Sequence, residues 1–183
     1  MREFALDPVF RYAASFTLAA IFLLGALDKM RYRELFATVV EAYGLLPVPF
    51  VAAFAFVVMI SELLIGGLLL FPITWPWSQL LGIWLLFVVT GAIVINIVRG
   101  RTDLACGCGG ASADQELSWT LVLRNGVLAA VLTAAVASPT PRAMVALDYL
   151  SIALAVSVGF SLYATVNQLA ANAPRLARLA RLG

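Results

Sequence analysis

The chain has 183 residues, of which 63% are hydrophobic and 12% charged, with a formal net charge of +2 and a mean hydropathy of +0.99. Soluble domains carry about 25% charged residues, so this composition excludes an ordinary soluble protein and predicts an integral membrane protein. The small net charge does not indicate a nucleic-acid partner, and the absence of histidine excludes haem ligation by histidine and most zinc catalysis.

Five apolar segments are long enough to cross a bilayer, whose hydrocarbon core of ~30 Å needs ~20 helical residues. Residues 35–46 are too short to span, but their apolar residues recur at helical spacing, which predicts a short interfacial or re-entrant helix after the first span. Residues 174–183 alternate arginine with leucine, which predicts a basic amphipathic tail against anionic lipid. We expect a single all-α domain over 1–183, a polytopic membrane bundle of four to five transmembrane helices. The predicted spans are 9–27, 50–71, 80–98, 118–137 and 143–169.

The polar loop 99–117 contains both cysteines of the chain, in the segment Cys106-Gly107-Cys108-Gly109-Gly110. Two cysteines separated by one residue close only a small, strained disulfide ring, and Gly107 allows the backbone conformation that such a ring needs. Strained disulfides exchange readily, and Gly109 and Gly110 allow a sharp turn into the next helix. Cys106 and Cys108 are therefore the candidate catalytic pair, with a purely structural disulfide and an incidental or metal-binding role as the alternatives. No metal site is predicted, since two thiolates leave zinc short of its four ligands.

Local signals after the cysteines predict the start of a helix. Ser112 and Gln115 have the spacing of a capping box before the fourth span. The positive end of that helix would lower the pKa of the nearby thiols. Cys106 lies farther from this helix start, so we expect it to be the more exposed of the two sulfurs.

Polar residues inside the spans are the second group of candidates, because a charge at the centre of a span costs at least ~2.5 kcal/mol. Glu62 lies in the middle of the second span, and Arg124 and Asn125 lie in the fourth. An ion pair between Glu62 and Arg124 is predicted, either as a structural contact or as part of a proton relay or substrate site. Lys29 ends the first span on the face of the thiol loop, where it either stabilises a thiolate or anchors the helix at the interface.

Several segments together resemble the MauE/DoxX-like family of membrane proteins, over about residues 11–125. The pairing of the glycine-rich thiol loop with the Arg-Asn dipeptide of the fourth span is the most specific part of this resemblance. The matching residues are Arg11, Gly25–Met30, Tyr43–Pro47, Glu62–Gly66, Cys106–Gly110 and Ser118–Asn125.

The resemblance implies a redox protein of the bacterial inner membrane that helps a periplasmic dehydrogenase to mature. The implied client is the small subunit of methylamine dehydrogenase, with its many disulfides, and the implied partner is a membrane-anchored thioredoxin-like protein. Whether the chain is itself a thiol-disulfide oxidoreductase stays open. Similar thiol pairs in vitamin K epoxide reductase-like enzymes pass electrons to a quinone, which makes a quinone a candidate cofactor, although no residue here identifies its site.

The charge distribution opposes an extracytoplasmic thiol loop. Five spans place most basic residues on the face that carries the cysteines, which the positive-inside rule assigns to the cytoplasm. Disulfides persist in oxidising compartments, and the implied periplasmic client favours the extracytoplasmic face, which we expect. Two alternative functions are a non-catalytic assembly subunit of a larger complex and a small-solute transporter that uses Glu62 and Arg124.

Overall fold

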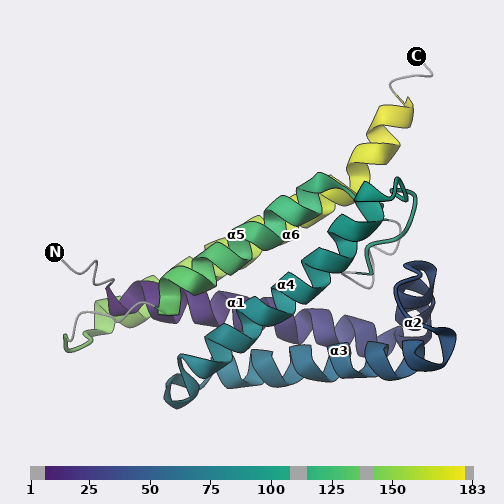
Figure 1. The fold of residues 1–183 in the computed structure, drawn as a ribbon. Helices are drawn as coiled ribbons and strands as arrows, with labels where there is room; N and C mark the ends of the chain where they lie inside the picture. The colour runs from purple at the N-terminus through teal and green to yellow at the C-terminus, as the bar shows by residue number, and fades with distance from the viewer. Residues whose placement is uncertain (1–6, 108–114, 137–141, 180–183) are drawn as a thin grey trace, which may run out of the picture.

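The computed structural model describes residues 7–107, 115–136 and 142–179, with side chains up to Asn172 (Figure 1). Within these ranges the chain is helical apart from loops and one isolated antiparallel bridge between Ala105 and Glu116. All the α-helices except α2 are long and apolar enough to cross a membrane, which gives five candidate spans and confirms the predicted all-α bundle. The elements are α1 (Pro8–Arg31), α2 (Arg33–Ala42), α3 (Val48–Leu69), the 3-10 helix η1 (Pro72–Thr74), α4 (Trp77–Val98), α5 (Trp119–Val136) and α6 (Ala146–Leu179).

The ends of the first helix show how local chemistry sets its length. The Asp7 carboxylate caps α1 by accepting a hydrogen bond of 2.9 Å from the Val9 N–H, which satisfies one of the free donors at a helix start. The helix then continues past the expected end at Leu27 as far as Arg31. Lys29 in this last turn is buried, so the polar residues after Leu27 belong to the bundle rather than to a loop.

The predicted short helix is present as α2. The prediction that a helix starts at the capping-box residues Ser112 and Gln115 is wrong at Gln115, which is not helical. The Cys106 N–H donates to the Gln115 carbonyl at 2.8 Å, and the Leu117 N–H donates to the Leu104 carbonyl at 3.0 Å. Because these backbone groups pair across the loop, the segment after position 114 is extended and α5 begins only at Trp119. Ser112 lies outside the described residues.

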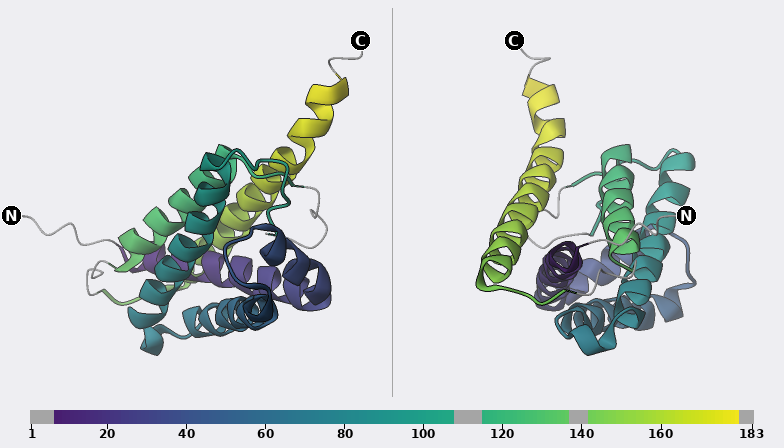
Figure 2. Two further views of the ribbon diagram at one scale, coloured as in Figure 1. Left: turned by 45° about the vertical axis from the view of Figure 1, so that its right-hand side comes forward. Right: turned by 90° about the vertical axis from the view of Figure 1, so that its left-hand side faces the viewer.

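Helix α1 is the centre of the bundle. It packs against α3, α5 and α6, while α4 packs against α3 and α5. The view along α1 in Figure 2 places α6 on one side of it and α4 and α5 on the other. The apolar core includes Leu18, Leu69, Leu85 and Leu132 from four different helices.

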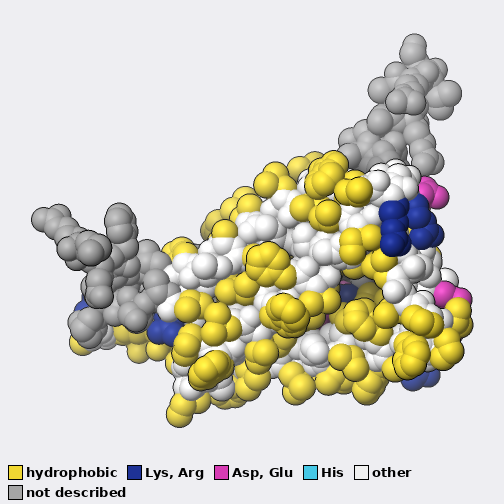
Figure 3. Space-filling view, in the orientation of Figure 1, with side chains coloured by type: hydrophobic (Ala, Val, Ile, Leu, Met, Phe, Trp, Pro, Cys, Tyr) yellow, Lys and Arg dark blue, Asp and Glu magenta, His cyan; other side chains and the backbone are white. Residues whose placement is uncertain are grey.

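One end of the bundle gathers the elements that carry the candidate residues. The C-terminal ends of α1 and α4, the whole of α2 and the N-terminal ends of α3 and α5 meet there (Figure 1). Figure 3 shows hydrophobic side chains over the spanning helices, with the charged side chains mainly at the two ends. The fold therefore brings residues from distant parts of the sequence to the thiol loop.

Gly66 and Gly67 offer a matched test of the contact between α1 and α3. A Cβ at Gly66 would lie 2.9 Å from Leu23 Cγ and 3.1 Å from the Leu23 backbone nitrogen, whereas a Cβ at Gly67 meets nothing within 4 Å. We expect Gly66→Ala to lower the free energy of unfolding by about 1–3 kcal/mol through overpacking. Gly67→Ala should leave it unchanged or slightly raise it. Thermal unfolding in detergent, followed by helical circular dichroism, measures both, and equal melting temperatures would contradict this packing.

Candidate functional site

The short helix α2 covers the first part of the thiol loop. Gly107 has φ +67°, and a Cβ there would lie 3.0 Å from Val39 Cγ1 and 3.3 Å from a ring carbon of Phe36. The Tyr43 hydroxyl donates a hydrogen bond of 3.1 Å to the Cys106 carbonyl. Burial raises the pKa of the Tyr43 phenol, so this hydroxyl keeps the proton that it donates. The predicted need for glycine at position 107 thus has two causes, its backbone conformation and the close approach of α2.

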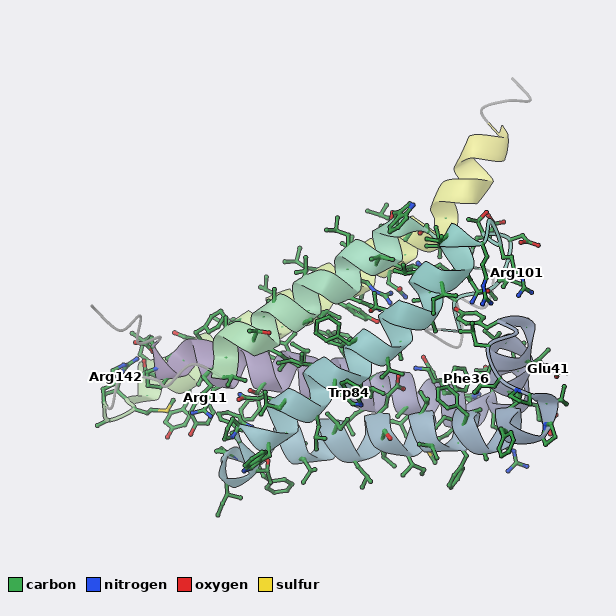
Figure 4. The ribbon with its side chains drawn as sticks, viewed as in Figure 1. Arg11, Phe36, Glu41, Trp84, Arg101 and Arg142 are labelled. Carbon is green, nitrogen blue, oxygen red and sulfur yellow. The ribbon has the colours of Figure 1, made fainter. Side chains whose placement is uncertain are left out.

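Arg101 fixes α2 from the other side of the loop (Figure 4). Its guanidinium donates to the carbonyls of Ala42 at 2.6 Å and Tyr43 at 3.1 Å, and to Asn96 Oδ1 at 3.5 Å. These carbonyls are at the C-terminal end of α2, where a cation is favourable. Arg101 was not among the predicted site residues, and its one signal is its place directly after Gly100, the glycine of positive φ that follows the end of α4 at Val98.

Cys106 is disulfide-bonded and buried, with 6% of its surface exposed. Its neighbours in the same buried cluster are Tyr43, Ile93, Leu117 and Leu121. The expectation that Cys106 is the exposed sulfur is therefore wrong, because α2 and the start of α5 cover it. Cys108, Gly109 and Gly110 lie outside the described residues.

The predicted ion pair between Glu62 and Arg124 is also wrong, because Glu62 pairs with Lys29. The Lys29 Nζ lies 2.8 Å from Oε1 and 2.7 Å from Oε2 of Glu62, and both residues are buried. Gly25 lies beside this contact, since a Cβ there would lie at ordinary van der Waals distance, 3.7 Å from the Lys29 Nζ and 3.8 Å from Glu62 Oε2. The adjacent helices α1 and α3 thus satisfy each other's buried charge.

Arg124 is held by neutral groups among the described residues. Its guanidinium donates to the side-chain oxygens of Asn125 and Asn167 and lies 5.3 Å from the centre of the Tyr163 ring. The Asn125 amide in turn donates to Thr90 Oγ1 at 3.1 Å, which joins α5 to α4. Arg124 therefore brings a positive charge into the bundle that none of the described carboxylates cancels by an ion pair.

All the predicted site residues that the structure describes line one small cavity of about 80 Å³, which also borders α2 and α6. The charges of the Lys29–Glu62 pair sum to zero, so the positive character of this cavity comes from Arg124. A positive charge beside a cysteine favours its thiolate over its thiol. Among the described residues, Arg124 rather than Lys29 is therefore the cation at this cavity that no described carboxylate pairs with. The site residues around the cavity are Lys29, Glu62, Cys106, Gly107, Arg124 and Asn125.

A double-mutant cycle tests the buried ion pair. We expect Lys29→Met and Glu62→Leu each to lower the free energy of unfolding by about 3–5 kcal/mol, because each leaves one buried charge without its partner. The double variant should lose much less than the sum, since it leaves no unpaired charge. Unfolding in mixed detergent micelles measures all four proteins, and additive losses would show that the two charges do not interact.

Gly107 and Gly100 form a second matched pair. Both have positive φ, but a Cβ at Gly100 meets nothing within 4 Å. Alanine at either position carries the cost of a left-handed backbone, about 1–2 kcal/mol, and only Gly107→Ala also pushes against α2. We expect a lower melting temperature for Gly107→Ala than for Gly100→Ala. The same melting temperature for both would mean that α2 does not press on the loop.

Comparison with known proteins places the chain in a family. The family model described as methylamine utilisation protein MauE matches residues 7–138, which cover α1 to α5. A methylamine utilization protein MauE of Paracoccus versutus is 36% identical over 92% of this chain and 91% of its own length. That of Paracoccus denitrificans is 37% identical over 79% of this chain and 77% of its own length. No solved structure matches. The chain therefore belongs to the MauE family of proteins of methylamine utilisation.

Proposed function

We propose that this chain is a membrane thiol-disulfide redox protein that helps a periplasmic enzyme to form its disulfides. The proposed client is the small subunit of methylamine dehydrogenase, and the proposed partner is a thioredoxin-like protein anchored in the same membrane. The observation that carries the proposal is the position of Cys106, a disulfide-bonded residue that lines the same cavity as all the described candidate charges.

The chemistry of this position supports exchange rather than reinforcement. A disulfide that only braces a loop gains nothing from a partly buried arginine, and inserting that charge into a span is costly. A thiolate formed during exchange does gain from it, because a nearby cation stabilises the thiolate. Arg124 and Cys106 on the wall of one cavity are therefore more easily explained by a thiolate intermediate.

The burial of Cys106 gives the two cysteines different roles in the proposed exchange. A buried sulfur does not meet the active site of a partner protein. We therefore assign to Cys108 the role of the sulfur that attacks the disulfide of the partner, or that a thiolate of the partner attacks. Cys106 then resolves the mixed disulfide by forming or opening the bond within the pair. Cys108 lies outside the described residues, so this assignment rests on the burial of Cys106.

We assign the thiol loop to the extracytoplasmic face, where disulfides persist. By the positive-inside rule, the basic residues at this end of the bundle favour a cytoplasmic thiol loop, but two of them form contacts within the protein. Lys29 neutralises Glu62, and Arg101 binds the carbonyls at the end of α2. These two cations are therefore weaker indicators of topology than arginines in a free loop.

The first experiment replaces the cysteines in a bacterium that grows on methylamine and whose own copy of the gene is deleted. We expect Cys106→Ser and Cys108→Ser each to abolish the maturation of methylamine dehydrogenase, because one sulfur alone cannot complete the exchange. The readouts are dehydrogenase activity and the number of free thiols in its small subunit. Gly100→Ala serves as the control, since it alters the same loop but no sulfur.

The amounts and melting temperatures of the variants separate chemistry from folding. A normal dehydrogenase in both serine variants would overturn the redox function and favour the non-catalytic assembly subunit. Labelling of whole cells with a membrane-impermeant maleimide tests the topology. We expect labelling only after reduction, whereas labelling that requires opened membranes would place the loop in the cytoplasm.

A further inference from the structure

A second cavity, of about 440 Å³, lies between α2, α3 and α4 and ends at Cys106. Pockets for small molecules have volumes of about 300–1,000 Å³ and mainly apolar walls, so this cavity is large enough for a ring-shaped ligand. Its walls are mainly apolar side chains and glycine, and the Tyr43 hydroxyl and the Trp84 indole N–H are the polar side-chain groups among the lining residues apart from Cys106. The aromatic members of the wall include Phe36 of α2 and Trp84 of α4, both labelled in Figure 4.

Cys106 belongs to the walls of both cavities. On one side it faces the small cavity with the ion pair and Arg124, and on the other it faces the large apolar cavity. Phe36, Val58 and Val89 also line both and separate the charged space from the apolar one. The buried, disulfide-bonded Cys106 therefore borders two chemically different environments.

The large cavity borders surface that faces lipid when the helices span a membrane. Trp84 and Phe87 of α4 line the cavity and are 68% and 65% exposed. The face of α3 and α4 seen in Figure 3 is mainly hydrophobic. A ligand that enters here must dissolve in hydrocarbon, which excludes a water-soluble redox carrier such as a nicotinamide nucleotide or glutathione.

We propose that this cavity binds a membrane quinone that oxidises the cysteine pair, an inference that rests on the redox function proposed above. Oxidation of two thiols to a disulfide releases two electrons and two protons. The S–S bond between Cys106 and Cys108 forms, both S–H bonds break, and the two quinone carbonyls become the hydroxyls of a quinol. A quinone is the class of lipid-soluble acceptor that takes up both electrons and both protons in one ring.

The test uses the full-length protein in detergent and decylubiquinone as the probe. Binding is measured on the oxidised protein, with Trp75, Trp77 and Trp119 replaced by phenylalanine, so that Trp84 is the remaining tryptophan. We expect decylubiquinone to quench the fluorescence of Trp84 saturably, because both occupy the same cavity. Electron transfer is measured on the reduced protein without oxygen, and about one quinol should form per chain, as a two-electron couple requires.

Gly91 and Gly67 supply the cavity-filling variant and its matched control. Neither has an atom within 4 Å of a Cβ placed on it, but Gly91 lines the large cavity and Gly67 does not. We expect Gly91→Leu to weaken binding and slow quinol formation at least about tenfold, the equivalent of about 1.4 kcal/mol. Gly67→Leu should stay within about twofold of the unaltered chain.

Exchange with a soluble thioredoxin separates the two proposals. If thioredoxin exchanges with the pair but decylubiquinone neither quenches Trp84 saturably nor forms quinol, the quinone inference is overturned and the redox function stands. Equal quenching and equal rates in Gly91→Leu and Gly67→Leu would also overturn it, because binding would then lie outside this cavity. If the reduced pair reacts with neither thioredoxin nor quinone, the redox function itself fails, and the electron transfer proposed here fails with it.

Discussion

The ion pair between Lys29 and Glu62 is the contact on which the candidate site depends. It joins α1 to α3 where both helices reach the thiol loop, and it allows two charges to remain in an otherwise apolar bundle. Breaking such a pair is costly because the remaining charge keeps its desolvation penalty without the compensating attraction.

The architecture could be predicted from the sequence because hydrophobic length sets the spans and helical spacing indicates the short helix. The partner of Glu62 could not be predicted in this way. Hydropathy shows that a residue lies within a span but not which neighbouring helix its side chain faces. Depth alone favoured Arg124 inside the fourth span over Lys29, which was placed at the end of the first. Packing decided between them, because Gly66 lets α3 approach α1 closely at Leu23, which places Glu62 beside the end of α1.

The errors around the thiol loop share a physical origin. The spacing of Ser112 and Gln115 suggested a helix start, and the distance of Cys106 from that start suggested that Cys106 is the more exposed sulfur. Both signals are local, whereas the loop is shaped by contacts with distant residues. The extended segment at Gln115 pairs with the backbone of Cys106, and α2 covers the result. Local preferences give way when tertiary contacts satisfy the same backbone groups better.

The anchors of this loop bind its backbone rather than its sulfur. Tyr43 donates to the carbonyl of Cys106, the Cys106 N–H donates to Gln115, and Arg101 binds the carbonyls of the covering helix. These groups are chemically the same whether the sulfur is oxidised or reduced. For the proposed exchange this means that the hydrogen bonds that hold the backbone of Cys106 need not break when its sulfur changes oxidation state, so the loop can keep its shape while the sulfur exchanges its bond.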